Sequence, residues 1–186
     1  MSPPNLSRRS FLRGKISAKS PAAIRPPWAV EERAFLANCS RCNRCISACP
    51  EKIIIVGDGG YPEVNFKLGE CTFCAQCARS CEAQVLQYSD SNSSDDSAST
   101  ADNAWCLHLS IDTKCLSMNA VVCRACGDSC DAQAIRFKLK TGGRSEPQVF
   151  LDDCNGCGAC VSVCPVDAVL VSRSATTEEN KSGTLS

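Results

Sequence analysis

The chain has 186 residues, with 20 basic and 20 acidic side chains. This balance gives no overall charge bias towards nucleic acid, and no apolar run of about 18 residues or more predicts a transmembrane helix. Aromatic residues make up only 5% of the chain, whereas 17 cysteines accompany a single histidine, His108. Such a composition places the chain among disulfide-rich or metal-binding proteins.

Three polar stretches divide the chain and are predicted to be poorly ordered. Residues 1–27 carry basic but no acidic side chains, residues 89–103 are rich in serine and aspartate, and residues 173–186 are polar. All cysteines lie between these stretches, in the blocks 28–88 and 104–172. We therefore predict a basic N-terminal arm, two modules joined by an acidic, flexible linker, and a polar tail.

The two blocks follow the same plan. In each, a short apolar run, a glycine turn and a second apolar run precede a cysteine cluster, which predicts a β-hairpin. Each block then ends in another short apolar run. The hairpin strands are predicted at 53–56 and 64–66 and at 134–139 and 149–151, and the final runs lie at 85–86 and 169–171. The expected fold is α+β, with two tandem ferredoxin-like modules of short hairpins and short helices.

Neither block is large enough to depend on its apolar core alone. Each has about 60 to 70 residues, a size at which apolar burial barely balances chain entropy. Isolated hairpins with strands this short are marginally stable. The cysteines are the only candidates for the missing cross-links.

Three cysteine runs share the spacing C-x2-C-x2-C-x3-C. They are Cys39, Cys42, Cys45 and Cys49; Cys71, Cys74, Cys77 and Cys81; and Cys154, Cys157, Cys160 and Cys164. A fourth set is incomplete, because Cys123, Cys126 and Cys130 keep the last two intervals while Ala120 stands where the first cysteine is expected. This spacing is typical of the runs that bind [4Fe–4S] clusters in bacterial-type ferredoxins.

Other uses of the cysteines fit the spacing less well. Cysteines two residues apart bridge poorly to each other, and a secreted context for disulfides is lacking. Structural zinc sites favour two separated pairs, often with histidine, and [2Fe–2S] proteins have a different spacing. We therefore predict four [4Fe–4S] clusters, which would use sixteen of the 17 thiols.

In such runs the first three cysteines bind one cluster and the fourth binds a second cluster. Pairing by block predicts Cys39, Cys42 and Cys45 with Cys81; Cys71, Cys74 and Cys77 with Cys49; Cys154, Cys157 and Cys160 with Cys130; and Cys123 and Cys126 with Cys164. The last set needs one more thiolate, from Cys115 or Cys106. Because Cys115 lies only eight residues before Cys123, we predict that Cys115 is the ligand and Cys106 the spare thiol.

The segment Ser7-Arg8-Arg9-Ser10-Phe11-Leu12-Arg13 matches a twin-arginine export signature. A working signal needs an apolar stretch next, but basic residues, prolines and a glycine interrupt residues 14–28. We interpret the segment as an arm that docks onto a partner through Arg8, Arg9, Phe11 and Leu12. A bland disordered tail and a true signal are the alternatives.

Three further residues have simpler explanations than a functional site. A lone histidine near a linker, such as His108, is expected to be an ordinary surface residue rather than a metal ligand. Trp28 and Trp105 stand at or near the start of their blocks. We expect both to pack over their modules, with a docking surface as the alternative.

The cysteine order and the N-terminal arm together resemble the NapF-type ferredoxins encoded with periplasmic nitrate reductases. The stretch from Cys123-Arg124-Ala125-Cys126 to Arg136-Phe137 is especially similar to that family's third motif. The resemblance implies a cytoplasmic iron–sulfur protein that contacts the catalytic subunit of the reductase before export and assists its maturation.

A second function class is a general electron carrier between a quinol-linked donor and a reductase, and a subunit of a larger membrane complex is a third possibility. An enzyme has little support, because the sequence shows no nucleophile–base set and no phosphate-binding loop.

Overall fold

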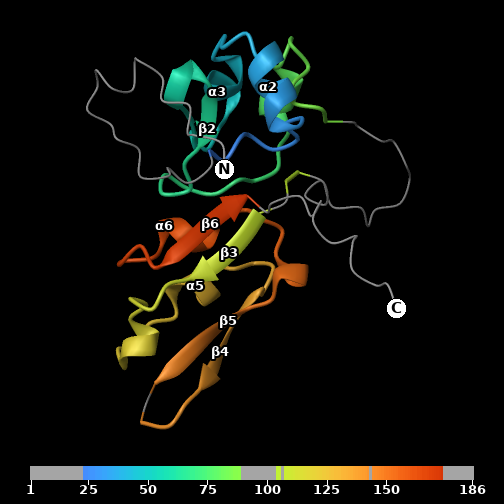
Figure 1. The fold of residues 1–186 in the computed structure, drawn as a ribbon. Helices are drawn as coiled ribbons and strands as arrows, with labels where there is room; N and C mark the ends of the chain where they lie inside the picture. The colour runs from blue at the N-terminus through green and yellow to red at the C-terminus, as the bar shows by residue number, and fades with distance from the viewer. Residues whose placement is uncertain (1–22, 89–103, 106, 143, 174–186) are drawn as a thin grey trace, which may run out of the picture.

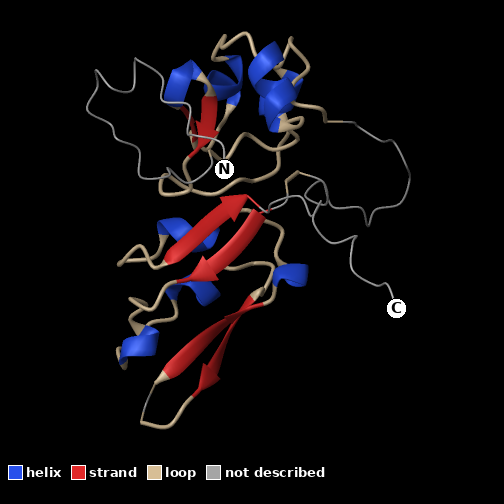
Figure 2. Cartoon of the chain, in the orientation of Figure 1, coloured by secondary structure: helices blue, strands red, loops and turns tan. Residues whose placement is uncertain are grey.

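The computed structural model describes residues 23–88, 104–105, 107–142 and 144–173. They form two halves stacked one upon the other, with the earlier residues at the top of Figure 1 and the later ones below. Short helices and two-stranded sheets alternate with long loops in both halves (Figure 2). No helix within the described ranges is long and apolar enough to cross a membrane.

The first half carries one hairpin and three short helices. Its elements are α2 (Glu32–Asn38), α3 (Arg44–Ala48), β1 (Ile54–Val56), the 3-10 turn η1 (Asp58–Gly60), β2 (Pro62–Val64) and α4 (Gln76–Arg79). The Glu31 side chain caps α2 by accepting hydrogen bonds from the amides of Arg33 and Ala34. Phe35 anchors this helix in the core, where it is fully buried.

The second half contains two antiparallel strand pairs. Its elements are β3 (Leu107–Ile111), η2 (Ser117–Asn119), α5 (Ala125–Asp128), β4 (Ile135–Leu139), β5 (Ser145–Val149), η3 (Leu151–Asp153), α6 (Ala159–Ser162) and β6 (Val169–Arg173). Strand β3 pairs with β6 next to the first half, and the β4–β5 hairpin extends away from it (Figure 1).

Both halves close in the same way, by pairing their first and last segments. In the first half this pairing is a single bridge between Ala29 and Leu86, flanked by hydrogen bonds from the Val30 amide to Val85 and from the Gln87 amide to Trp28. In the second half, β3 and β6 pair along five residues. The repeated closure agrees with the duplicated plan seen in the sequence.

The second strand of each hairpin differs from its predicted position. Strand β2 covers 62–64 rather than 64–66, because the chain turns after Asn65 and directs Phe66 into the core, where it is 4% exposed. Strand β5 covers 145–149 rather than 149–151, because the turn brings Ser145 opposite Leu139. The apolar pattern marked both hairpins, but turn geometry set their register.

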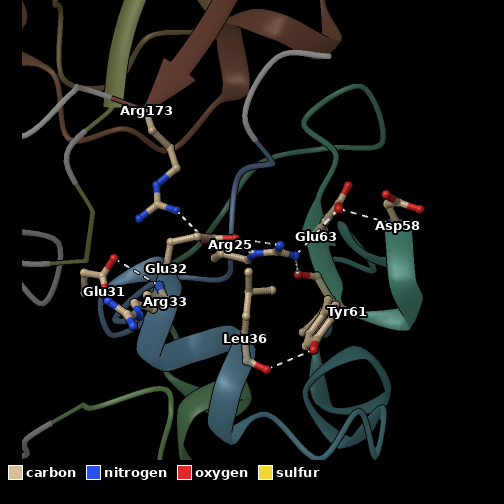
Figure 3. A network of polar contacts seen from close by, with 10 residues as sticks. Arg25, Glu31, Glu32, Arg33, Leu36, Asp58, Tyr61, Glu63 and Arg173 are labelled. Atoms are coloured by element: carbon tan, nitrogen blue, oxygen red, sulfur yellow. Dashed lines mark hydrogen bonds and ion pairs between the residues drawn. The ribbon is translucent and has the colours of Figure 1, made fainter. Parts of the chain in front are cut away.

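A polar network built on Arg25 joins the two halves (Figure 3). The Arg25 guanidinium, 7% exposed, pairs with Glu32 at 2.8 Å and donates to the Pro62 carbonyl. Arg173, at the end of β6, pairs with the same Glu32 at 2.6 Å. Arg25 lies within the predicted arm. The segment that packs against the first half therefore begins before Trp28, the predicted start of the first module.

Candidate metal centres

The three complete cysteine runs share one backbone conformation. In each, the residue before the second cysteine and the residue after it have a positive φ, between 52° and 83°. These residues are Arg41 and Asn43, Phe73 and Ala75, and Gly156 and Gly158. A short helix then begins and carries the third cysteine, and the fourth cysteine follows the helix end. The run therefore wraps three thiols around one space and directs the fourth elsewhere.

The first three cysteines of the first run meet the last cysteine of the second run. Cys39, Cys42, Cys45 and Cys81 line one cavity of about 370 Å³, counting the open solvent at its mouth. Burial raises the pKa of Cys45 to about 11, and the neighbouring Cys39 and Cys81 add to the shift. Cys42 is exposed, and hydrogen bonds from the Arg44 amide and Ser40 lower its pKa.

The remaining cysteines of the first half form the reciprocal group. Burial raises the pKa of Cys77 to about 12, with further contributions from the charges of Cys71, Cys49 and Cys74. The pKa of Cys71 rises to about 11, mainly through burial, and Cys74 and Cys49 again contribute. Cys49, Cys71, Cys74 and Cys77 are therefore electrostatic neighbours, as the cross-pairing of two runs requires.

The third complete run pairs with the irregular one. Cys154, Cys157 and Cys160 line a cavity of about 460 Å³, including open solvent, together with Cys130. The Ala134 amide donates a hydrogen bond to the Cys130 Sγ at 3.3 Å. Burial raises the pKa of Cys160 to about 12.

The irregular set gathers around a cavity of about 340 Å³, including open solvent, lined by Cys115, Cys123, Cys126 and Cys164. The Asn119 side chain holds the Cys115 loop by donating to the carbonyls of Thr113 and Cys115, each at 2.8 Å. Cys115 is 8% exposed. Cys106 lies outside the described residues.

The donor set suits a multi-iron cluster. Zinc would hold its sulfurs about 2.3 Å from one point, but among the described residues no three histidine, cysteine or acidic side chains come close enough to share one ion. The sixteen described cysteines are all free of disulfides. Since burial favours the neutral thiol, four thiolates around one cavity need cationic metal to offset their charge.

Sequence reasoning missed the backbone amides that donate to the fourth cysteines of the second half, Cys130 and Cys164. The Ala168 amide donates to the Cys164 Sγ at 3.1 Å, as the Ala134 amide does to Cys130. Each donor lies four residues after its cysteine, and both alanines are 1% exposed. The signal available in the sequence was an alanine four residues after Cys130 and again four residues after Cys164.

Two predictions concern residues away from the cysteines. His108 lies exposed on β3. The predicted partner-binding residues Arg8, Arg9, Phe11 and Leu12 lie outside the described residues.

Comparisons with known proteins agree with this architecture. Residues 38–109 and 121–168 match the model of the 4Fe-4S dicluster domain. The chain is 45% identical over 174 residues to the ferredoxin-type protein NapF of Haemophilus influenzae, covering 89% of this chain and 93% of that protein. The chain belongs to the NapF family of ferredoxin-type iron–sulfur proteins.

Two further relatives extend the comparison. NapF of Escherichia coli K12 is 42% identical over 163 residues, covering 88% of this chain and 92% of that protein. The ferredoxin-type protein NapG of the same organism is 29% identical over 172 residues, covering 84% of this chain and 72% of that protein. The family confirms the resemblance and agrees with the tandem ferredoxin-like plan, and it places this NapF-family chain among electron-transfer or accessory iron–sulfur proteins.

Proposed function

We propose that the chain holds four [4Fe–4S] clusters. Three are each bound by three cysteines of one run and one cysteine of another, and the fourth is bound by Cys115, two cysteines of the irregular run and one cysteine of the last complete run. The sets are Cys39, Cys42, Cys45 and Cys81; Cys49, Cys71, Cys74 and Cys77; Cys130, Cys154, Cys157 and Cys160; and Cys115, Cys123, Cys126 and Cys164. The observation that carries this proposal is that three separate cavities are each lined by four cysteines in this cross-paired arrangement. The clusters would supply one-electron chemistry.

The chain's own residues orient and shield each centre. Left-handed residues in the loops turn successive thiols inward, and the amides of Ala134 and Ala168 donate to ligand sulfurs. Such hydrogen bonds and the surrounding apolar shell are the features by which a protein adjusts a cluster's reduction potential. Phe35, Val85 and Leu86 form part of that shell around the first cavity.

The finer function that we propose is accessory. The chain would act in the cytoplasm on the catalytic subunit of a periplasmic nitrate reductase before that subunit is exported, and would assist its maturation. Membership of the NapF family supports this proposal, as does the basic arm. Arg8 and Arg9 can form bidentate bonds to carboxylates, and Phe11 with Leu12 would supply an apolar anchor.

A general electron carrier is the second candidate. The exposure of Cys42 and Cys74 favours it, because ligands at the surface bring a centre within reach of any redox partner. The two candidates differ in their need for the arm: a free carrier needs no dedicated basic extension, whereas an accessory protein uses it to recognise one partner.

A capture experiment separates them. Full-length protein carrying Arg8→Ala and Arg9→Ala is compared with a Lys15→Ala, Lys19→Ala variant, which loses the same charge from the same arm. We expect the arginine pair to be needed for capture of the reductase catalytic subunit, with iron content unchanged, and high salt to weaken capture by the parent protein. Normal capture by the arginine variant would put the docking surface on the ferredoxin-like modules, whereas no capture by the parent protein would favour the carrier.

A further inference from the structure

The two halves meet through their cluster-binding loops. The amide of Cys71, the first cysteine of its run, donates a hydrogen bond to the carbonyl of Cys157, the second cysteine of another run, at 2.8 Å. Cys71 belongs to the first half and Cys157 to the second. A direct backbone contact therefore joins ligand loops of two different dicluster modules.

Aromatic side chains fill the space beside this contact. Phe66 packs edge to face on Trp105, with ring centroids 5.5 Å apart, and Phe73 approaches the same indole at 6.4 Å. Phe66 and Phe73 come from the first half, and Trp105 comes from the start of the second. Trp105, Leu107, Val161 and Val171 all pack against the apolar core of the first half. The two halves thus share one continuous core at this junction.

This packing, and not backbone conformation alone, explains why Gly156 and Gly158 stand in the run from Cys154 to Cys164. The matching left-handed positions in the other two complete runs hold Arg41 and Asn43, and Phe73 and Ala75, at φ values of 52° to 62°. Side chains are therefore compatible with the loop. A Cβ on Gly158 would overlap the Phe66 ring, and one on Gly156 would lie 2.6 Å from the Trp105 Nε1.

Polar contacts also link the two halves. Lys67 pairs with Asp167 at 2.9 Å, and the Trp28 amide donates to the Ala104 carbonyl at 2.6 Å. The Arg173–Glu32 pair described above adds a third link. Apolar packing, backbone bonding and ion pairs therefore all act between the same two halves.

We propose that this junction, formed by Phe66, Cys71, Trp105, Gly156 and Gly158, locks the two modules into a single four-cluster electron-transfer unit. The sets containing Cys71 and Cys157 are the inner pair, and the sets containing Cys42 and Cys115 are the outer pair. This inference rests on the ligand sets of the proposed function. An electron lost on one side of the junction is gained on the other, so exchange across it needs no further reagent.

The test uses the full-length holoprotein with a protease site introduced between residues 89 and 103. After anaerobic cleavage, gel filtration reports whether the halves remain together, and electron paramagnetic resonance of the dithionite-reduced protein reports magnetic coupling between clusters. Gly158→Ala adds a single methyl group at the junction, at a position where Ala75 shows that the loop accepts alanine. Gly142→Ala is the matched control, since Gly142 also has a positive φ, 78°, and a Cβ there would meet nothing within 4 Å.

We expect the cleaved parent and Gly142→Ala halves to elute together and the Gly158→Ala halves to elute separately, with loss of part of the magnetic coupling. Adding Phe66→Ala to Gly158→Ala makes room for the methyl group and should restore co-elution. Separation of the parent halves, or co-elution and an unchanged spectrum in Gly158→Ala, would overturn the junction. Iron and sulfide are measured on every sample, so that low cluster content in the parent would instead contradict the proposed function.

Discussion

The two halves reach the same arrangement of thiols by different routes. The first half uses two complete runs, and each run supplies three cysteines to one group and one to the other. The second half has only one complete run and completes its irregular group with Cys115, from a loop eight residues before Cys123. The comparison teaches that four thiols can be brought around one cavity without the regular spacing, and that the regular spacing is one of at least two ways to do so.

The backbone of the irregular run shows why its first cysteine is displaced. Arg124 follows the second cysteine position but has a φ of −136°, where the complete runs have a left-handed residue. Ala120 stands at the expected cysteine position in a left-handed conformation, φ 62°. In two of the complete runs the first cysteine, Cys39 or Cys154, is extended. The loop is therefore built differently, around Cys115 and Asn119.

Removing the clusters should unfold both halves, whether their cysteine runs are complete or irregular. Each half has only a small core, so metal cross-links supply much of its folding free energy. Circular dichroism after chelation under reducing conditions should show no cooperative thermal transition. If one half kept its transition, that half would be shown to fold without its clusters.

Changing Cys115→Ser should cost the second half one cluster, a loss of about four irons per chain. Cys106→Ser serves as the control and should leave iron content unchanged. Iron and labile sulfide are assayed in anaerobically purified protein. The opposite pattern would make Cys106 the ligand of the irregular set.

The Arg25 network gives a test of how tightly the halves are held. Glu32→Gln removes the anion shared by Arg25 and Arg173 and leaves the buried Arg25 with weaker partners, at a cost of about 1–3 kcal/mol. We expect cluster bleaching on heating to begin several degrees lower. Glu146→Gln, which breaks the exposed pair with Lys140, should change this temperature little.

The network also sets a pH dependence. Burial would raise the pKa of Glu32, but the hydrogen bonds and charges of Arg25 and Arg173 outweigh it and lower the pKa. A lowered folded-state pKa stabilises the protein above the unfolded pKa, and this contribution is lost as pH falls through the folded value. The bleaching temperature of the Glu32→Gln variant should therefore be closest to that of the parent at acidic pH, where the parent has lost this contribution.

The smallest change is expected from restoring the regular spacing. Adding Ala120→Cys to Cys115→Ser should not recover the lost irons, because position 120 has the left-handed conformation rather than the extended one of Cys39 and Cys154. Full recovery of iron would show that the loop rearranges freely and that spacing alone decides the ligand.

The grouping of the cysteines was predictable because it depends on local spacing and on the known cross-pairing of such runs. Strand β3 was missed, although Leu107-His108-Leu109-Ser110-Ile111 alternates apolar and polar residues as a strand does. The contacts between halves were beyond sequence reasoning. Arg173 and Glu32 are 141 residues apart, and nothing local in either residue indicates its partner. The role of Gly158 likewise became visible only with Phe66 beside it.

The central claim is that four cross-paired thiol groups each hold a [4Fe–4S] cluster. Metal and sulfide analysis of anaerobically purified, iron-replete protein tests it most directly. We predict about sixteen irons and sixteen acid-labile sulfides per chain. Stoichiometric zinc without labile sulfide, or about half that iron in protein whose sixteen described cysteines are intact, would contradict it.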